Sequence, residues 1–194
     1  MLNKKKINKI LKKHIKPKME KSKKEPEIHI DENESYKSTS KELSIIADLL
    51  TDICEESTTN KDTNGPIIKP FISKKIPSVS IKSYLDRLAK YSKIENNTLL
   101  LILIYIDKVC DINKIRLNYF NIHKMILASM IIAIKYNEDD YFSNSFYAKV
   151  GGVSKSEIDV LEYEFLVLIE FNLYVSDDLF LKYYDYIKNV EDEE

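Results

Sequence analysis

The sequence contains few of the residues on which tight turns, disulfide frameworks and metal centres depend. Only three glycines and two cysteines occur among 194 residues. So little glycine disfavours phosphate-binding glycine loops and an all-β fold with many tight turns. The cysteines, Cys54 and Cys110, are too few for a disulfide framework, which favours a reducing compartment. We therefore expect an intracellular protein, in the nucleus, the cytoplasm or both.

Long hydrophobic runs are also missing. The longest is Leu99–Ile106, eight residues that end at Asp107, whereas a membrane-spanning helix needs about 20 apolar residues. The N-terminus has no apolar stretch of the kind found in secretory signals. We interpret 99–106 as part of a buried core segment.

Residues with catalytic or metal-binding chemistry are scattered. His14, His29 and His123 do not show the spacing of metal ligands, and neither cysteine lies near them. Cys110 follows an apolar helix, where a small hydrophobe is a better interpretation than a nucleophile. Phosphate loops and nucleophile elbows are absent from the sequence. We predict no metal, no cofactor, no small-molecule substrate and no enzymatic activity.

Charge is distributed unevenly along the chain. Residues 1–24 hold eleven lysines and one glutamate, a net charge of +10, while the remaining residues carry 19 basic and 30 acidic side chains, a net charge of -11. Residues 1–40 are predicted to be a mostly disordered basic arm. Within it an amphipathic helical stripe is formed by Ile7, Ile10, Leu11, His14 and Ile15. This stripe could contact nucleic acid, an anionic membrane or an import receptor, or it could belong to a solubilising tail.

Apolar spacing after residue 40 is helical rather than alternating, so we predict an all-α fold. Ser40 is a candidate N-cap for the first helix, Ser78 or Ser80 for the second, and Ser154–Glu157 has the pattern of a capping box. The core-facing run at 97–110 is the candidate for the centre of the bundle. The expected helices are 41–56, one through 81–88, 97–110, 121–136, 143–150, 154–171 and one through 179–187. The expected domains are a basic arm at 1–40, an N-terminal helix and linker at 41–70, a main body at 71–176, and a C-terminal helix with an acidic tail at 177–194.

Two charged residues lie on apolar helical stripes. Lys135 follows Ile131 and Ile132 by four and three residues, and Glu162 lies between Ile158 and Phe165. In one interpretation the dipole of the helix C-terminus favours Lys135, and Glu162 pairs with it. In the other, both side chains anchor a protein partner, since desolvated charges at an interface select the partner and fix its register.

A second candidate pair is Arg87 and Asp107. Arg87 lies in "YLDRLAKY", and Asp107 interrupts the most apolar segment. A buried arginine with one carboxylate would lock two helices together, so we interpret this pair as structural.

These residues, in this order, resemble the cyclin box, and in particular the single-box P/U-type cyclins, a class that includes a yeast phosphate-signalling cyclin. The resemblance runs over residues 71–181 and is carried by "IPSVSIKSYLDRLAKY", "LILIYIDKV", "NIHKMILASMIIAIKY" and "YFSNSFYAKVGGVSKSEIDVLEYEFLVLIEFNLYVS". It implies a cyclin box of five helices around a central helix, here with an extra N-terminal helix and a short C-terminal helix.

The resemblance also implies a partner and roles for single residues. The partner is a cyclin-dependent kinase, contacted through Lys135 and Glu162 together with the apolar Ile131, Ile158 and Phe165. In the family, the residues matching Arg87 and Asp107 form a buried internal pair.

Some features depart from the family pattern. Lys108 and Lys124 stand where these cyclins usually have arginine, so bidentate contacts are lost. The docking motif of the cell-cycle cyclins is not recognisable near Tyr84–Leu88. About 13 residues follow Leu181, too few for a second cyclin fold.

The resemblance implies a regulatory subunit that activates a cyclin-dependent serine/threonine kinase by ordering its C-helix. The alternative is a cyclin-fold transcription or nucleic-acid-binding factor that uses the basic arm. A salt titration separates the two, because counterion release makes nucleic-acid affinity fall steeply with salt.

Overall fold

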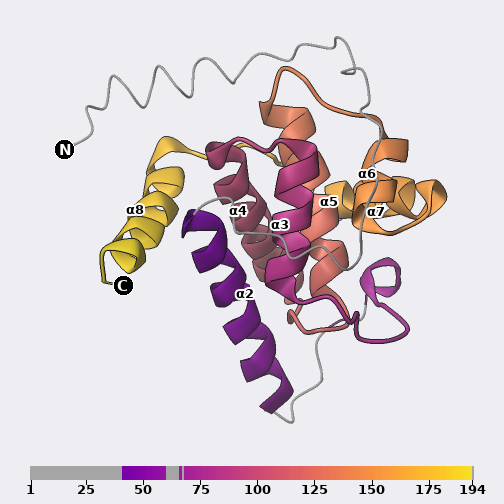
Figure 1. The fold of residues 1–194 in the computed structure, drawn as a ribbon, viewed down its shortest axis with the longest axis horizontal. Helices are drawn as coiled ribbons and strands as arrows, with labels where there is room; N and C mark the ends of the chain where they lie inside the picture. Colours follow the sequence, from indigo (N-terminus) through magenta and orange to yellow (C-terminus); the bar gives the residue numbers. More distant parts are fainter. Residues whose placement is uncertain (1–40, 60–65, 67, 194) are drawn as a thin grey trace.

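The computed structural model describes residues 41–59, 66 and 68–193, and all regular structure in these ranges is helical (Figure 1). The all-α prediction is thus confirmed, while the predicted basic arm and the Ser40 cap lie outside the described residues. The elements are α2 (Lys41–Thr59), η1 (Lys69–Phe71), α3 (Ile81–Ser92), α4 (Asn96–Asn113), α5 (Ile122–Asn137), α6 (Asn144–Gly151), α7 (Lys155–Leu168) and α8 (Asp177–Glu193).

Serine side chains cap the N-termini of three helices between residues 71 and 176. Ser80, Ser143 and Ser154 each accept a hydrogen bond from a backbone N–H three residues later, at the starts of α3, α6 and α7. Ser80 is therefore the cap of α3, rather than Ser78. The capping box at Ser154 is only half formed, because the Glu157 carboxylate pairs with Lys124 at 2.8 Å.

The end of α7 differs from the prediction. The apolar pattern extends to Phe171, but the helix ends at Leu168. Glu170 and Phe171 both have a left-handed backbone conformation, with φ of 55° and 54°. Two consecutive left-handed residues cannot continue a right-handed helix, so the chain turns there and Phe171 leaves the helical stripe.

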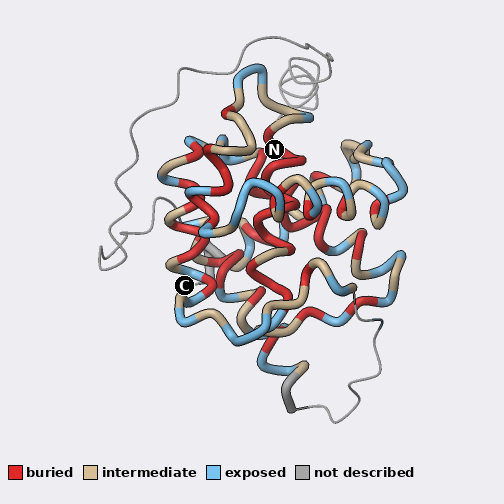
Figure 2. Tube along the Cα trace, turned by 90° about the vertical axis from the view of Figure 1, so that its right-hand side faces the viewer, coloured by how far each residue is buried: buried red, intermediate tan, exposed pale blue. Residues whose placement is uncertain are grey.

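Helices α4 and α5 pack against each other, and buried segments gather in the interior of the molecule (Figure 2). In α5 every residue from Ile122 to Ile134 is buried except Lys124, and α3, α4, α7 and η1 all pack against this helix. In α4 burial is continuous only from Thr98 to Ile106. The segment 97–110, predicted to be the centre of the bundle, is therefore only partly enclosed, and α5 is the more enclosed helix.

Helices α2 and α8, which flank the predicted main body, belong to the same hydrophobic core as the helices between them. In α2, Leu43 and Leu50 are fully buried, and in α8 Ile187 is 2% exposed. An ion pair between Glu42 and Lys188, at 2.9 Å, joins the two helices. The predicted boundaries at residues 70 and 176 stay a prediction, although no break in the core marks them.

Within the described ranges, no helix is both long and apolar enough to cross a membrane. The same part of the chain contains no group of three or more histidine, cysteine or acidic side chains that could hold a metal ion.

Candidate protein-docking site

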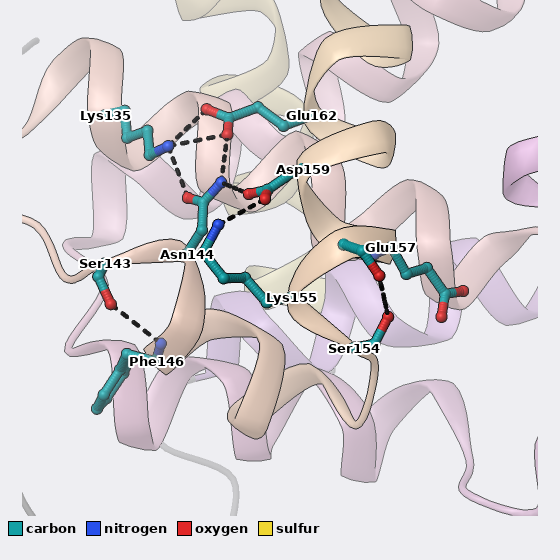
Figure 3. A network of polar contacts seen from close by, with 10 residues as sticks. Lys135, Ser143, Asn144, Phe146, Ser154, Lys155, Glu157, Asp159 and Glu162 are labelled. Carbon is teal, nitrogen blue, oxygen red and sulfur yellow. Dashed lines mark hydrogen bonds and ion pairs between the residues drawn. The ribbon is translucent and has the colours of Figure 1, made fainter.

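Lys135 lies in the last turn of α5 and is paired with Glu162 of α7. Its Nζ donates to Glu162 Oε1 at 2.7 Å, to Glu162 Oε2 at 2.9 Å and to Asn144 Oδ1 at 2.7 Å (Figure 3). The carbonyl groups at a helix C-terminus are the negative end of the helix dipole, which favours a cation there. The lysine is thus anchored by its own helix and by two neighbouring ones.

Asn144, the first residue of α6, connects this ion pair to a second one. Its Nδ2 donates to Glu162 Oε2 and to Asp159 Oδ1, both at 2.8 Å (Figure 3). Asp159 also accepts from Lys155 at 2.6 Å. These two bonds, the one from Lys155 foremost, hold the pKa of the Asp159 carboxyl below its ordinary value. Asn144 was not predicted as a site residue, because a lone polar residue after a cap carries no periodic signal.

The pair is half-buried rather than sealed inside. The side chains of Lys135 and Glu162 are 27% and 18% exposed. Lys135 has three N–H donors, and the three bonds above use them all. The Glu162 carboxylate has about four acceptor positions, of which Lys135 and Asn144 fill three. Glu162 therefore keeps acceptor capacity at the protein surface.

Three residues predicted to contact a kinase are instead in the core. Ile131, Ile158 and Phe165 are each 0% exposed. An apolar stripe on a helix is buried first against the protein's own neighbouring helices. In this structure these three side chains present no surface to a partner, and their predicted kinase contact stays a prediction.

Exposed apolar side chains lie on the solvent side of α7 and in the segments just before and after it. Residues at positions i, i+3 and i+7 share a helix face, and on α7 these are Val160, Tyr163 and Val167, exposed by 48%, 61% and 42%. They face away from the core-facing Ile158, Leu161 and Phe165 stripe. Three further exposed aromatic residues complete what we call the α7 surface, defined as Tyr136, Val160, Tyr163, Val167, Phe171 and Tyr174.

The loop that follows α7 is fixed by side chains from α4. Tyr105 donates its hydroxyl to the carbonyl of Leu173 at 2.9 Å, and Lys108 Nζ donates to the carbonyls of Asn172 and Tyr174 at 2.9 and 3.0 Å. Partial burial lowers the pKa of Lys108. Lys108 thus holds the loop with one hydrogen bond to each of two carbonyls, and the bidentate geometry of an arginine is not needed.

Lys124, the second lysine that departs from the expected family pattern, joins α5 to α7 and to the chain before α3. It pairs with Glu157 and also donates to the carbonyls of Pro70 and Ile72, at 3.2 and 3.4 Å. Lys108 and Lys124 therefore both connect separate segments of the fold.

The predicted pair between Arg87 and Asp107 is not formed. Asp107 is exposed and accepts a hydrogen bond from the Tyr183 hydroxyl of α8. The guanidinium of Arg87 lies over the Tyr84 ring, 5.0 Å from its centroid. The reason is topological: α8 packs along α4, whereas α3 packs against α2, α5 and α6.

The two thiols are not activated. Burial raises the pKa of both Cys54 and Cys110 to about 12, and both are free. A thiol with so high a pKa is a poor nucleophile at neutral pH. This agrees with the interpretation of Cys110 as a small hydrophobe.

Comparison with known proteins assigns the fold. The family model described as Cyclin matches residues 5–173. The chain is similar to Cyclin-U4-1 of Arabidopsis thaliana, with 30% identity over 77% of this chain and 75% of that protein. It is also 38% identical to the PHO85 cyclin-like protein psl1 of Schizosaccharomyces pombe, over 59% of this chain and 51% of that protein. PHO85 cyclin-7 of Saccharomyces cerevisiae is 31% identical, over 70% of this chain and 52% of its own length.

Proposed function

The chain belongs to the cyclin family, as a P/U-type member, and we propose that it is a regulatory subunit that binds and activates a cyclin-dependent serine/threonine kinase. The match of the family model to residues 5–173 carries the proposal. The names of two yeast relatives, a PHO85 cyclin-like protein and a PHO85 cyclin, support a cyclin-dependent kinase as partner. In this role the chain is regulatory and carries out no chemistry itself.

The proposed mechanism is a population shift in the kinase. Phosphoryl transfer requires the lysine of the third kinase strand to pair with the glutamate of the kinase C-helix. A subunit that binds only the conformation with this pair intact moves the equilibrium toward it. A shift from 1:99 to 99:1 requires a binding preference of about 5.5 kcal/mol.

We assign the contact to Lys135, Glu162 and the α7 surface. The free acceptor position of Glu162 suits a backbone N–H of the partner, and the exposed aromatic side chains suit its apolar residues. The hydrogen bonds that Lys135 donates to Asn144 and Glu162 hold its side chain in place before binding. Less side-chain entropy is then lost when the complex forms.

A charge exchange tests whether the pair contacts the partner or only stabilises the box. The double variant Lys135→Glu with Glu162→Lys keeps an ion pair between α5 and α7 but reverses which charge each helix presents. Alanine variants are less decisive, because they leave Asn144 without two of its partners. We expect the exchange to weaken kinase binding at least about tenfold, measured by titration against the purified kinase that the full-length chain recovers from its source cells.

A matched pair of aromatic variants tests the α7 surface. Tyr163→Ala is expected to cost about 2 kcal/mol of binding, roughly 30-fold, as aromatic side chains at interface centres do. Tyr186→Ala, on α8 and 50% exposed, is the control and should change binding less than about twofold. Unchanged kinase affinity in both the exchange variant and Tyr163→Ala would refute the assigned surface.

The alternative of a nucleic-acid-binding factor depends on residues 1–24, which lie outside the described residues. We also propose the intracellular location, nuclear or cytoplasmic, that a kinase partner requires.

A further inference from the structure

A cavity of about 710 Å³ lies between the C-terminal halves of α2 and α4. We call it the α2–α4 groove. Its floor is apolar and buried, and Ile53 of α2, 37% exposed, stands at its rim. Carboxylates of α2 and α4 and one arginine are part of the wall. The lining residues are Leu50, Ile53, Glu56, Ser57, Leu103, Ile106, Asp107, Cys110, Ile115, Arg116 and Leu117.

The helix that forms one wall of the groove is strongly acidic. Between Lys41 and Thr59, α2 contains five carboxylates and one lysine. The charged residues that line the groove itself are Glu56, Asp107 and Arg116. An apolar floor beside an acidic helix fits an amphipathic helix with apolar residues on one face and cations on its flanks.

The same chain contains a segment with these properties. Ile7, Ile10, Leu11 and Ile15 have the i, i+3, i+4, i+8 spacing of helix-in-groove anchors, and eight lysines lie between residues 4 and 18. The net charge of +10 over residues 1–24 opposes the -11 of the rest of the chain.

The connection is long enough for this segment to reach the groove. Residues 16–40 separate the stripe from α2, and a coil of that length has an r.m.s. span of about 28 Å. The groove begins at Leu50 and extends to Ser57, which is about 14–24 Å along α2 from Lys41 at 1.5 Å per residue. Binding within one chain therefore benefits from an effective concentration in the millimolar range.

We propose that residues 7–15 of this chain bind in the α2–α4 groove as an amphipathic helix, with the isoleucines and Leu11 on the apolar floor and lysines beside Glu56 and the other carboxylates of α2. The kinase site assigned above lies on α5, α6 and α7, so this proposal does not depend on the proposed function. In Figure 1 α2 and α7 lie on different sides of α4 and α5.

Amide hydrogen exchange of the full-length chain tests the proposal. In wild-type protein at low salt, we expect the amides of residues 7–15 to exchange at least about tenfold more slowly than an unstructured peptide of the same sequence. Ile53→Lys places a cation at the groove rim and should restore fast exchange. Leu11→Lys should do the same from the side of the arm, without altering any described residue.

The matched control is Ile76→Lys, which places the same charge at a position 52% exposed outside the groove and should leave exchange in residues 7–15 slow. Exchange in α5, read in the same samples, reports whether each variant is folded. The proposal is overturned if residues 7–15 exchange at the unstructured rate in wild type, or if slow exchange survives in Ile53→Lys. Slow exchange that disappears on dilution would also overturn it, because the bound arm would then belong to a second copy.

Discussion

At the scale of single residues, His123 combines burial with an incomplete set of hydrogen bonds. Its Nε2–H donates to the carbonyl of Val79 at 2.9 Å, while its Nδ1 is buried without a partner. The Tyr84 ring packs against the imidazole at a centroid distance of 5.0 Å. Desolvation, mainly, lowers the pKa of His123, and the charge of Arg87 acts in the same direction.

The lowered pKa of His123 predicts a loss of stability in mild acid. Below about pH 6.5 an unfolded histidine binds a proton, while the folded one resists it, so the unfolded state holds more protons and the free energy of unfolding falls as pH falls. We expect urea denaturation to show lower stability at pH 5.5 than at pH 7.5. His123→Gln should flatten that part of the profile, and an equal slope in wild type and variant would contradict the assignment.

At the scale of elements, the adjacent glycines Gly151 and Gly152 have different roles. Gly152 ends α6 in a left-handed conformation, with φ of 71°. Gly151 is still helical, and a Cβ added to it would lie 2.6 Å from a Leu127 methyl carbon of α5. The Tyr84 hydroxyl donates to its carbonyl at 3.1 Å. One glycine thus permits a turn, and the other lets α6 approach α5.

Gly151→Ala should therefore destabilise the protein by about 1–3 kcal/mol, the usual cost of overpacking a core. Leu127→Ala alone should cost about 2–5 kcal/mol, because it leaves a cavity. In the double variant the new methyl group occupies part of that cavity, so we expect a total cost below the sum of the two. Denaturant unfolding of all three variants measures this coupling, and strict additivity would argue against the close contact.

At the scale of the whole molecule, the flanking helices and the box share one continuous core. Ile187 of α8 is 2% exposed, and Leu43 of α2 is fully buried. A core of this kind unfolds cooperatively in a domain of this size. The segments at 41–70 and 177–194 would then be parts of one folding unit with 71–176.

Ile187→Ala is expected to lower the free energy of unfolding by about 2–5 kcal/mol while keeping a single transition. Circular dichroism, which reports all helices, and tyrosine fluorescence should give the same midpoint for the variant and for wild type. Ile76→Ala, at an exposed loop position, should change stability by less than about 0.5 kcal/mol. Two separate transitions in Ile187→Ala would show that α8 is an independent unit.

The sequence by itself determined the helical class, most helix starts and the two charged residues on apolar stripes. These features depend on local chemistry: a serine side chain caps the N–H groups three residues later, and apolar spacing of 3.6 residues selects a helix. Ser80, Ser154, Lys135 and Glu162 were all found in this way.

Only the tertiary structure decided which surfaces remain exposed and which charges meet. Periodicity identifies the apolar face of a helix but not what covers it, so Ile131, Ile158 and Phe165 proved to be core residues. Asp107 pairs with Tyr183 because α8 packs along α4. Asn144 bonds to Glu162 because α6 packs against α7. Contacts between segments distant in sequence depend on how the helices pack, and the spacing of residues along the chain does not specify that packing.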